Sequence, residues 1–141
     1  MIQALTPVHA TLMAGMHHVC FKDPWNEAAM AELLAMPGAF GWLAEEGGPQ
    51  GFILARTAAD ESEILTLLIL PPFRRQGLAR TLIEKAATGA RDSGAAHLFI
   101  EVAASNIAAL ALYTNSRFQQ VGCRRHYYGA GLDALLMSKS L

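Results

Sequence analysis

The chain has 141 residues and a mass of 15.2 kDa, which excludes large multidomain enzymes and predicts a single domain over residues 1–141. Hydrophobic residues make up 52% and charged residues 16%, which excludes disorder, and a net charge of −1 lacks the basic excess of a nucleic-acid binder. Uncharged apolar runs stay short of the ~18 residues that a membrane helix needs. No basic region precedes Lys22, which argues against a secretory signal. Two cysteines form neither a disulfide framework nor a zinc site. We therefore expect a cytoplasmic protein with neither a membrane nor a nucleic acid as partner.

The N-terminal part of the chain predicts a short strand at Ile2–Leu5 and then two helices. The first helix, over residues 8–21, would bury one stripe of apolar side chains, namely Val8, Leu12, Met16 and Val19. Asn26 can cap the second helix, and Pro37-Gly38 would end it.

Three strands are predicted next. Residues 39–44 and 51–57 flank a polar, glycine-containing segment and read as a hairpin. Residues 63–70 (EILTLLIL) are nearly all apolar, as expected for a strand that is covered on both faces.

The most regular pattern in the sequence predicts a helix over residues 77–92. One buried stripe at helical spacing comprises Leu78, Ala79, Leu82, Ile83, Ala86, Ala87 and Ala90. Gly94 is well placed to end this helix.

The C-terminal part predicts a buried strand over residues 97–102, a helix over 106–116, and two closing strands over 119–127 and 133–139 around the loop Gly129–Gly131. The strand–helix–strand unit in the middle of the chain, with hairpin-like ends, indicates an α/β fold with a mixed sheet.

The segment before the 77–92 helix favours binding of an anion. Helix N-termini carry backbone N–H groups without partners and a partial positive charge. Gly77 and the small Ala79 would let an anion approach the backbone, and Arg74, Arg75 and Arg80 add charge. The pattern suits a pyrophosphate, although it is neither a Walker loop nor a dinucleotide fingerprint. The alternative is an ordinary loop whose arginines are solvated.

Three polar side chains follow near the end of the next strand. Glu101 interrupts a buried strand close to its C-terminal end, where sites of open α/β sheets lie, and a half-buried carboxylate can serve as a general base. Asn106 and Tyr113 lie two helical turns apart on one face of the following helix. Alternatively, Glu101 faces the solvent, Asn106 is only a helix cap and Tyr113 packs in the core.

Taken together, these features resemble the GNAT superfamily of acetyl-CoA-dependent N-acetyltransferases. The loop Arg74-x-x-Gly77-x-Ala79 matches the superfamily's pyrophosphate pattern. Residues 101–113 (EVAASNIAALALY), 124–128 (RRHYY) and 24–27 (PWNE) resemble the RimI branch, which acetylates protein N-termini. The resemblance covers nearly the whole chain and implies a mixed sheet of about seven strands, splayed at its centre, with about four helices.

The resemblance also implies a role for each matching residue. Glu101 would be the general base and Tyr113 the acid that protonates the departing thiolate. Acetyl-CoA would be held, without any metal, by Leu67, Leu68, Ile69, Arg74, Arg75, Gln76, Gly77, Leu78, Ala79, Arg80 and Asn106. Trp25, Tyr127 and Tyr128 would line the acceptor side, although all three could instead be packing residues.

The expected acceptor is the α-amine of a peptide or protein N-terminus, such as an alanine of a ribosomal protein, and the expected enzyme is a monomer or weak dimer. Two alternatives stay open, namely acetylation of a small-molecule or polyamine amine and a CoA-binding module without turnover. One residue departs from the family. Arg117 stands where relatives usually have glycine before Phe118, and a left-handed backbone there would cost Arg117 roughly 1 kcal/mol.

Overall fold

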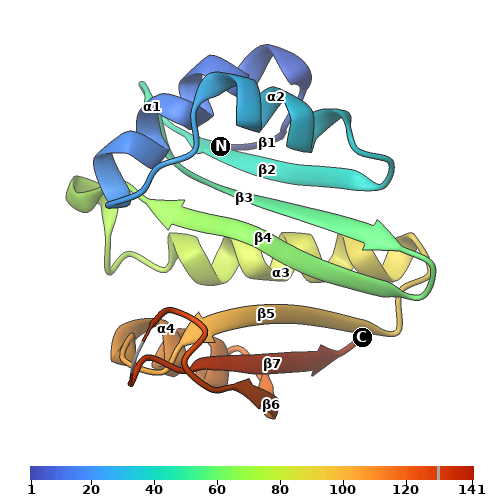
Figure 1. Cartoon of the computed structure of the whole chain (residues 1–141). Coiled ribbons are helices and arrows are strands. Elements are labelled where there is room, and N and C mark those ends of the chain that lie inside the picture. Colours follow the sequence, from blue (N-terminus) through green and yellow to red (C-terminus); the bar gives the residue numbers. More distant parts are fainter. Residues whose placement is uncertain (130) are drawn as a thin grey trace.

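Seven strands form one mixed sheet in the order β1-β2-β3-β4-β5-β7-β6 (Figure 1). The computed structural model describes residues 1–129 and 131–141. The strands are β1 (Ile2–Ala4), β2 (Ala39–Glu45), β3 (Pro49–Ala58), β4 (Glu61–Ile69), β5 (His97–Ala103), β6 (Gln119–Arg124) and β7 (Ala134–Ser140). Neighbouring strands are antiparallel except β4 and β5, which are parallel. The predicted α/β class and mixed sheet are confirmed.

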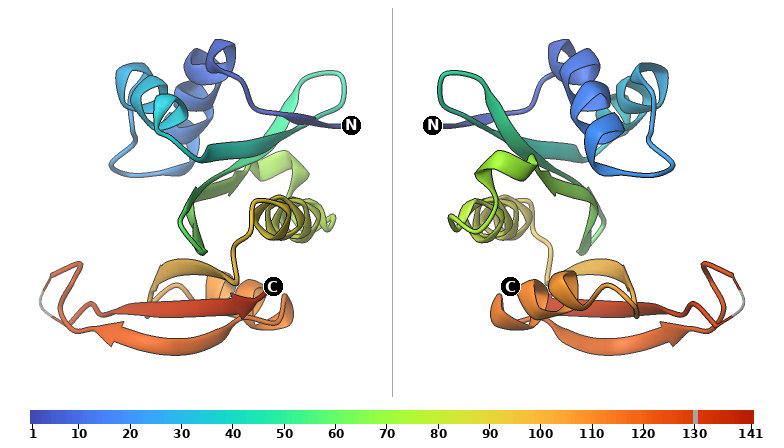
Figure 2. Two further views of the ribbon diagram at one scale, coloured as in Figure 1. Left: turned by 90° about the vertical axis from the view of Figure 1, so that its right-hand side faces the viewer. Right: turned by 90° about the vertical axis from the view of Figure 1, so that its left-hand side faces the viewer.

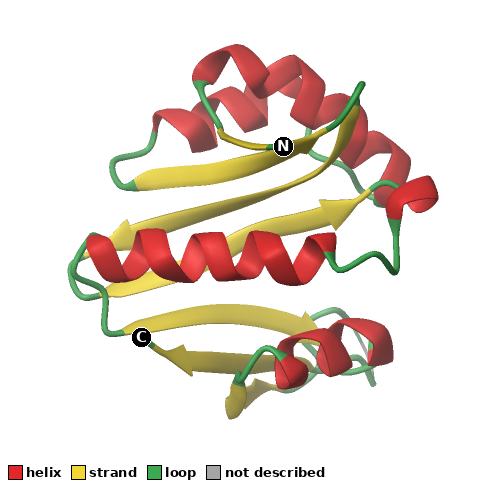
Figure 3. Cartoon of the chain, turned by 180° about the vertical axis from the view of Figure 1, so that it is seen from behind, coloured by secondary structure: helices red, strands yellow, loops and turns green. Residues whose placement is uncertain are grey.

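Two helices lie on each side of the sheet (Figures 2 and 3). They are α1 (Ala10–Cys20), α2 (Glu27–Ala35), α3 (Leu78–Asp92) and α4 (Ile107–Asn115), with short 3-10 turns at Pro7–His9 and Pro71–Phe73. The pair α1 and α2 covers one face over β2 and β3, whereas α3 and α4 cover the other. No helix within residues 1–129 and 131–141 is long and apolar enough to cross a membrane.

The sheet is splayed between its two parallel strands. Pairing of β4 with β5 runs only from Glu61↔His97 to Glu63↔Phe99. The register of β4 against β3 then shifts by one residue at Leu65, and such bulges bend a strand and increase its twist. The second half of β4 therefore turns away from β5, as Figure 2 shows for the two halves of the sheet.

Each face of the sheet packs its own apolar core. The predicted α3 stripe is confirmed, since Leu82, Ile83 and Ala86 are almost fully buried against the sheet together with Tyr113 and Phe118. On the other face, Met13 and Met30 from α1 and α2 are fully buried against β2, β3 and β4. These two cores fix the helices whose ends border the splayed region.

Three predictions about individual elements are wrong. Of the stripe predicted for α1, Met16 is buried and Leu12 is half-buried, but Val8 and Val19 are 84% and 63% exposed. Val8 lies in the 3-10 turn before α1, and the buried residues of the helix are Ala10, Met13, Met16 and His17. The strand predicted over 63–70 is not covered evenly, because its alternate residues Leu65 and Leu67 are only half-buried at the splayed edge.

The third error concerns the end of β6. The strand was predicted to reach Tyr127 but ends at Arg124, because His126 adopts a left-handed backbone (φ +56°). The backbone N–H of His126 donates to Asp133 Oδ1 at 2.9 Å and closes this turn. The loop predicted at Gly129–Gly131 follows it, and Ala130 of that loop lies outside the described residues.

Candidate active site

Two cavities lie where β4 and β5 diverge, and they share three side chains, those of Leu67, Ala109 and Tyr113. The first, of about 400 Å³, is enclosed by the end of β4, the loop before α3, the first turn of α3 and one face of α4. The second, of about 450 Å³, lies between the α1–α2 connection, β4, β5 and Tyr128. Two substrates that entered from opposite faces would thus meet at these three side chains.

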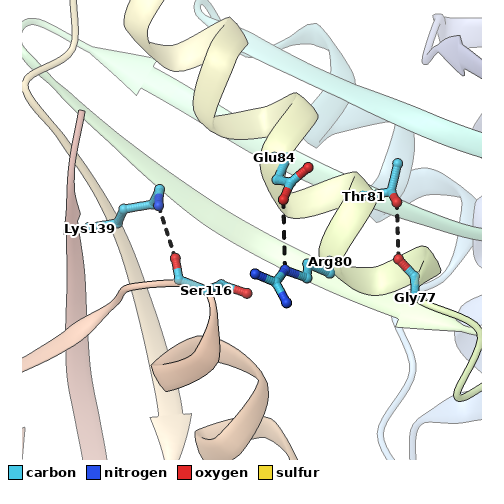
Figure 4. Close-up of polar contacts among 6 residues, drawn as sticks. All are labelled: Gly77, Arg80, Thr81, Glu84, Ser116 and Lys139. Atoms are coloured by element: carbon cyan, nitrogen blue, oxygen red, sulfur yellow. Dashed lines mark hydrogen bonds and ion pairs between the residues drawn. The ribbon is translucent and has the colours of Figure 1, made fainter.

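The start of α3 provides an open anion-binding surface to the first cavity. Gly77 precedes the helix with a left-handed backbone (φ +82°), and no other atom lies within 4 Å of where its Cβ would be. The first helical turn lines this cavity, and its N–H groups, which lack intrahelical partners, are suited to bind an anion there. Thr81 Oγ1 donates to the Gly77 carbonyl at 3.0 Å and fixes this turn (Figure 4).

Most of the predicted cofactor-binding residues border this cavity. They are Leu67, Leu68, Ile69, Arg74, Arg75, Gly77, Leu78, Ala79 and Arg80. Gln76 does not line it, and Asn106 lines the second cavity instead. All three arginines are exposed, but Arg74 Nε donates to the Ile69 carbonyl at 2.8 Å. Arg74 therefore holds the end of β4 as well as contributing charge.

An aromatic wall borders the second cavity where α1 meets the segment before α2. The ring of His17 is buried and stacks between Phe21, at 4.2 Å, and Trp25, at 4.9 Å. Its Nδ1 accepts from the backbone N–H of Trp25 at 3.0 Å, so its Nε2 carries the proton and lies 3.3 Å from Thr66 Oγ1 on β4. Burial lowers the pKa of His17, which keeps this neutral, bridging form. His17 thus fixes Trp25 to the sheet.

A carboxylate lies at the opposite side of the same cavity. Glu101 on β5 is 27% exposed, and its Oε1 lies 3.2 Å from Nη1 of Arg124 at the end of β6. Tyr128 borders the cavity beside it. Partial burial, together with the charge of Glu101 and the neighbouring Tyr127, raises the pKa of the Tyr128 phenol. The cavity therefore combines an ion-paired carboxylate with aromatic walls.

Tyr113 lies at the junction of the two cavities. It is 5% exposed, and burial raises the pKa of its phenol, which therefore keeps its proton throughout the neutral range. Asn106 begins α4, and its Oδ1 accepts from the backbone N–H of Ala109 at 3.1 Å. Asn106 thus makes the helix cap given as its alternative role while also lining the second cavity.

The structure brings most, but not all, of the predicted acceptor residues together. Trp25 and Tyr128 line the second cavity, whereas Tyr127 does not and instead lies under the Arg124 guanidinium, 5.4 Å from ring centre to Cζ. Sequence reasoning missed His17 and Arg124. The spacing of His17 and Phe21 (i, i+4) beside Pro24-Trp25 was the available signal for His17, whereas nothing local in the sequence indicated that Arg124 pairs with Glu101.

Comparisons with known proteins give consistent matches. The model of the Acetyltransferase (GNAT) family matches residues 11–117. The chain is 36% identical to the N-alpha-acetyltransferase RimI of Mycobacterium tuberculosis, over 98% of this chain and 90% of that protein. It is 33% identical to the [ribosomal protein bS18]-alanine N-acetyltransferase of Escherichia coli K12, over 82% of this chain and 80% of that one. The crystal structure of the ribosomal-protein-S18-alanine N-acetyltransferase from Escherichia coli superposes with a TM-score of 0.88 at 28% identity, covering 99% of this chain and 92% of the other.

Proposed function

The chain belongs to the Acetyltransferase (GNAT) family and is an N-acetyltransferase, and from this premise we propose that it acetylates the α-amine of a protein N-terminus in the cytoplasm. The acceptor class that we propose is an N-terminal alanine of a ribosomal protein, the substrate named for the Escherichia coli relative. The observation that carries the proposal is the meeting of two differently lined cavities at Tyr113.

The first cavity is the proposed site of acetyl-CoA, which supplies the thioester. The edge of β4 at residues 67–69, which does not pair with β5, would hold the extended arm of the cosubstrate by main-chain hydrogen bonds. The start of α3, with Arg75 and Arg80, would hold the pyrophosphate through backbone N–H groups and charge. The family's use of acetyl-CoA and the open backbone at Gly77 support this assignment.

In the second cavity, Glu101 is the proposed general base. It would accept a proton from the attacking amine, directly or through a water molecule, and its contact with Arg124 fixes its orientation. Tyr113 would donate a hydrogen bond, and then its proton, to the departing sulfur, because it borders both cavities and is protonated at neutral pH.

An α-amine suits this machinery better than a lysine side chain. At pH 7 roughly a tenth to a fifth of α-amines are neutral, against roughly one lysine in a few thousand. The described lining of the second cavity offers two carboxylates, Asp23 and Glu101. Two carboxylates would attract a single amine, whereas a polyamine would call for a longer row of them.

The test uses one peptide with an N-terminal alanine and an internal lysine, incubated with acetyl-CoA, and locates the acetyl group by mass spectrometry. The same peptide with a blocked N-terminus is the matched control, and spermidine is assayed in parallel. We expect label on the α-amine and little on the blocked peptide. Label mainly on lysine, or only on spermidine, would replace the proposal by one of the other acceptor classes. Binding of acetyl-CoA without any turnover would favour a non-catalytic module.

A further inference from the structure

A third cavity, of about 390 Å³, continues the second one along the sheet. Its described lining consists of strand residues, from β3 to β7, and Figure 2 shows that α1 and α2 lie over the other end of the sheet. The second cavity lies over residues 65–67 of β4 and 100–103 of β5, whereas this one lies over residues 61–63 and 99–101 of the same strands. The two cavities share Ile100 and Glu101. We call the third cavity the strand groove, and it begins at the proposed general base.

The strand groove has an apolar floor beside charged side chains. Phe99 lies two residues before Glu101 on β5 and therefore points to the same face of the sheet, and Leu136 lies opposite Glu101 on β7. Both apolar side chains are half-buried. The charged residues of the lining are Arg56, Glu61, Glu63, Glu101 and Arg124, with a formal charge of −1. An apolar floor with charges around it suits an extended peptide, whose chain needs both kinds of contact.

The unpaired charge of the strand groove is negative. Arg124 is already paired with the proposed base. Arg56 lies opposite Glu63 in the β3–β4 register, but its Nε donates to the Pro37 carbonyl at 3.1 Å. Glu61 and Glu63 are exposed and form no ion pair with any described residue. Both arginines of the groove therefore have oxygen partners, whereas both β4 carboxylates can accept hydrogen bonds from a cationic ligand.

The spacing of these carboxylates from the proposed base matches an extended peptide. Glu63 lies opposite Phe99 in the β4–β5 register, and Glu61 lies two residues earlier on the same strand. Strand geometry then places the Cα atoms of Glu63 and Glu61 about 8 Å and about 14 Å from that of Glu101. An extended chain advances about 3.3 Å per residue. An acceptor whose α-amine lies at Glu101 therefore brings its third or fourth residue to Glu63 and its fifth to Glu61.

We propose that the strand groove binds the acceptor beyond its N-terminal residue and selects acceptors that carry an arginine or lysine at positions three to five. The apolar floor would contact the extended chain, and Glu61 and Glu63 would bind the basic side chain. Arg56 and Arg124 stand in the same lining and would repel a polyamine, which carries cations along its whole length. This selection rests on the proposed function, because the α-amine must first occupy the second cavity.

The experiment compares kcat/KM for three peptides that begin with alanine. The first has arginine at positions four and five, and the second has citrulline, a neutral analogue of arginine, at the same positions. The third has its two arginines at positions nine and ten, beyond the groove. We expect the first peptide to react roughly fivefold more efficiently than the other two, through a lower KM, as exposed ion pairs predict. Mass spectrometry checks that the acetyl group is on the α-amine.

Two double variants locate this preference for the first peptide. Glu61→Gln/Glu63→Gln should reduce the preference to about twofold or less. Glu32→Gln/Asp92→Asn is the matched control, because it removes two exposed carboxylates outside the lining and should keep the preference. All four positions are exposed, so both variants should fold, which thermal unfolding checks.

The outcomes separate the groove from the proposed function. Equal kcat/KM values for the first two peptides in the wild type would refute the groove and leave N-terminal acetylation intact. A preference that survives in Glu61→Gln/Glu63→Gln would also refute it, and an equal loss in both double variants would assign the preference to the net charge of the protein instead. A wild type that acetylates none of the peptides would refute the proposed function; if spermidine is then acetylated, and Glu61→Gln/Glu63→Gln lowers that rate, the groove binds a polyamine.

Discussion

Replacing Arg117 by glycine should stabilise the protein. Helix α4 ends with Phe118 N–H donating to the Tyr113 carbonyl at 3.0 Å and Arg117 N–H donating to the Thr114 carbonyl at 3.1 Å, which is the Schellman arrangement that favours glycine at position 117. The left-handed backbone costs an L-residue about 1–2 kcal/mol. Glycine recovers this cost but loses roughly 0.5–1 kcal/mol in chain entropy. The net gain is about 0.5–1 kcal/mol, which corresponds to a Tm higher by about 2–4 °C for a domain of this size.

The assay is urea unfolding at pH 7 of the wild type, Arg117→Gly and Arg117→Ala. The alanine variant removes the same charge but keeps Cβ, so it separates backbone strain from relief of repulsion by Lys139. We expect the midpoint of Arg117→Gly to rise without a change in the m-value, and that of Arg117→Ala to stay near wild type. Equal gains in both variants, or a loss in the glycine variant, would refute the strain argument.

Three further predictions concern the two cavities. Gly77→Glu should abolish acetyl-CoA binding in calorimetry, whereas Gly77→Ala, which has the same backbone strain without the charge, should retain most of it. Glu101→Gln should lower kcat by ~10²–10⁴-fold at pH 7 with little effect on acetyl-CoA affinity. The control variant Glu32→Gln, on α2, should keep the kcat of the wild type. A Glu101→Gln rate within twofold of wild type would exclude the base role. The pKa of His17 is lowered in the folded state. The neutral ring therefore stabilises the folded protein fully at pH values above its ordinary pKa of 6.5, and this stabilisation is lost as the pH falls through the pKa of the folded state. Thermal stability of the wild type should therefore fall more between pH 7.5 and 5.5 than that of His17→Asn, and parallel curves would contradict the bridge to Trp25.

Local patterns in the sequence predicted local structure well. The α3 stripe is buried as its spacing indicates, Asn26 caps α2 by accepting from the Ala29 N–H at 2.9 Å, and Gly94 ends α3 with φ +91°. In each case the determining interactions lie within a few residues of the pattern. The α1 face was assigned only in part: Met16 is buried as predicted, whereas Val8 lies in a 3-10 turn that precedes the helix and Val19 is exposed.

The side-chain partners of the site were less predictable, because they depend on long-range order. Glu101 and Arg124 are 23 positions apart and meet only because β7 lies between β5 and β6 in the sheet. Likewise, His17 reaches Thr66 across 49 positions. Motif resemblance named residues with matching chemistry, but it did not distinguish Arg74, which bonds to the end of β4, from Arg75 and Arg80. Side-chain direction at a loop is set by neighbours that the loop sequence does not contain.

The end of α4 links the strained residue to the proposed acid. Tyr113 supplies the carbonyl that closes the terminal turn, and its ring packs edge-on against Phe118 at 5.3 Å, the hydrophobic contact typical of this helix end. Arg117 therefore forms the same turn that glycine would form without strain. This turn holds Tyr113 by the hydrogen bond to its carbonyl and by the contact of its ring with Phe118. Because the turn keeps its hydrogen bonds, the left-handed backbone of Arg117 leaves the phenol at the junction of the two cavities. The strain raises the energy of the folded state without displacing Tyr113, so loss of strain in Arg117→Gly bears on stability rather than on proton transfer.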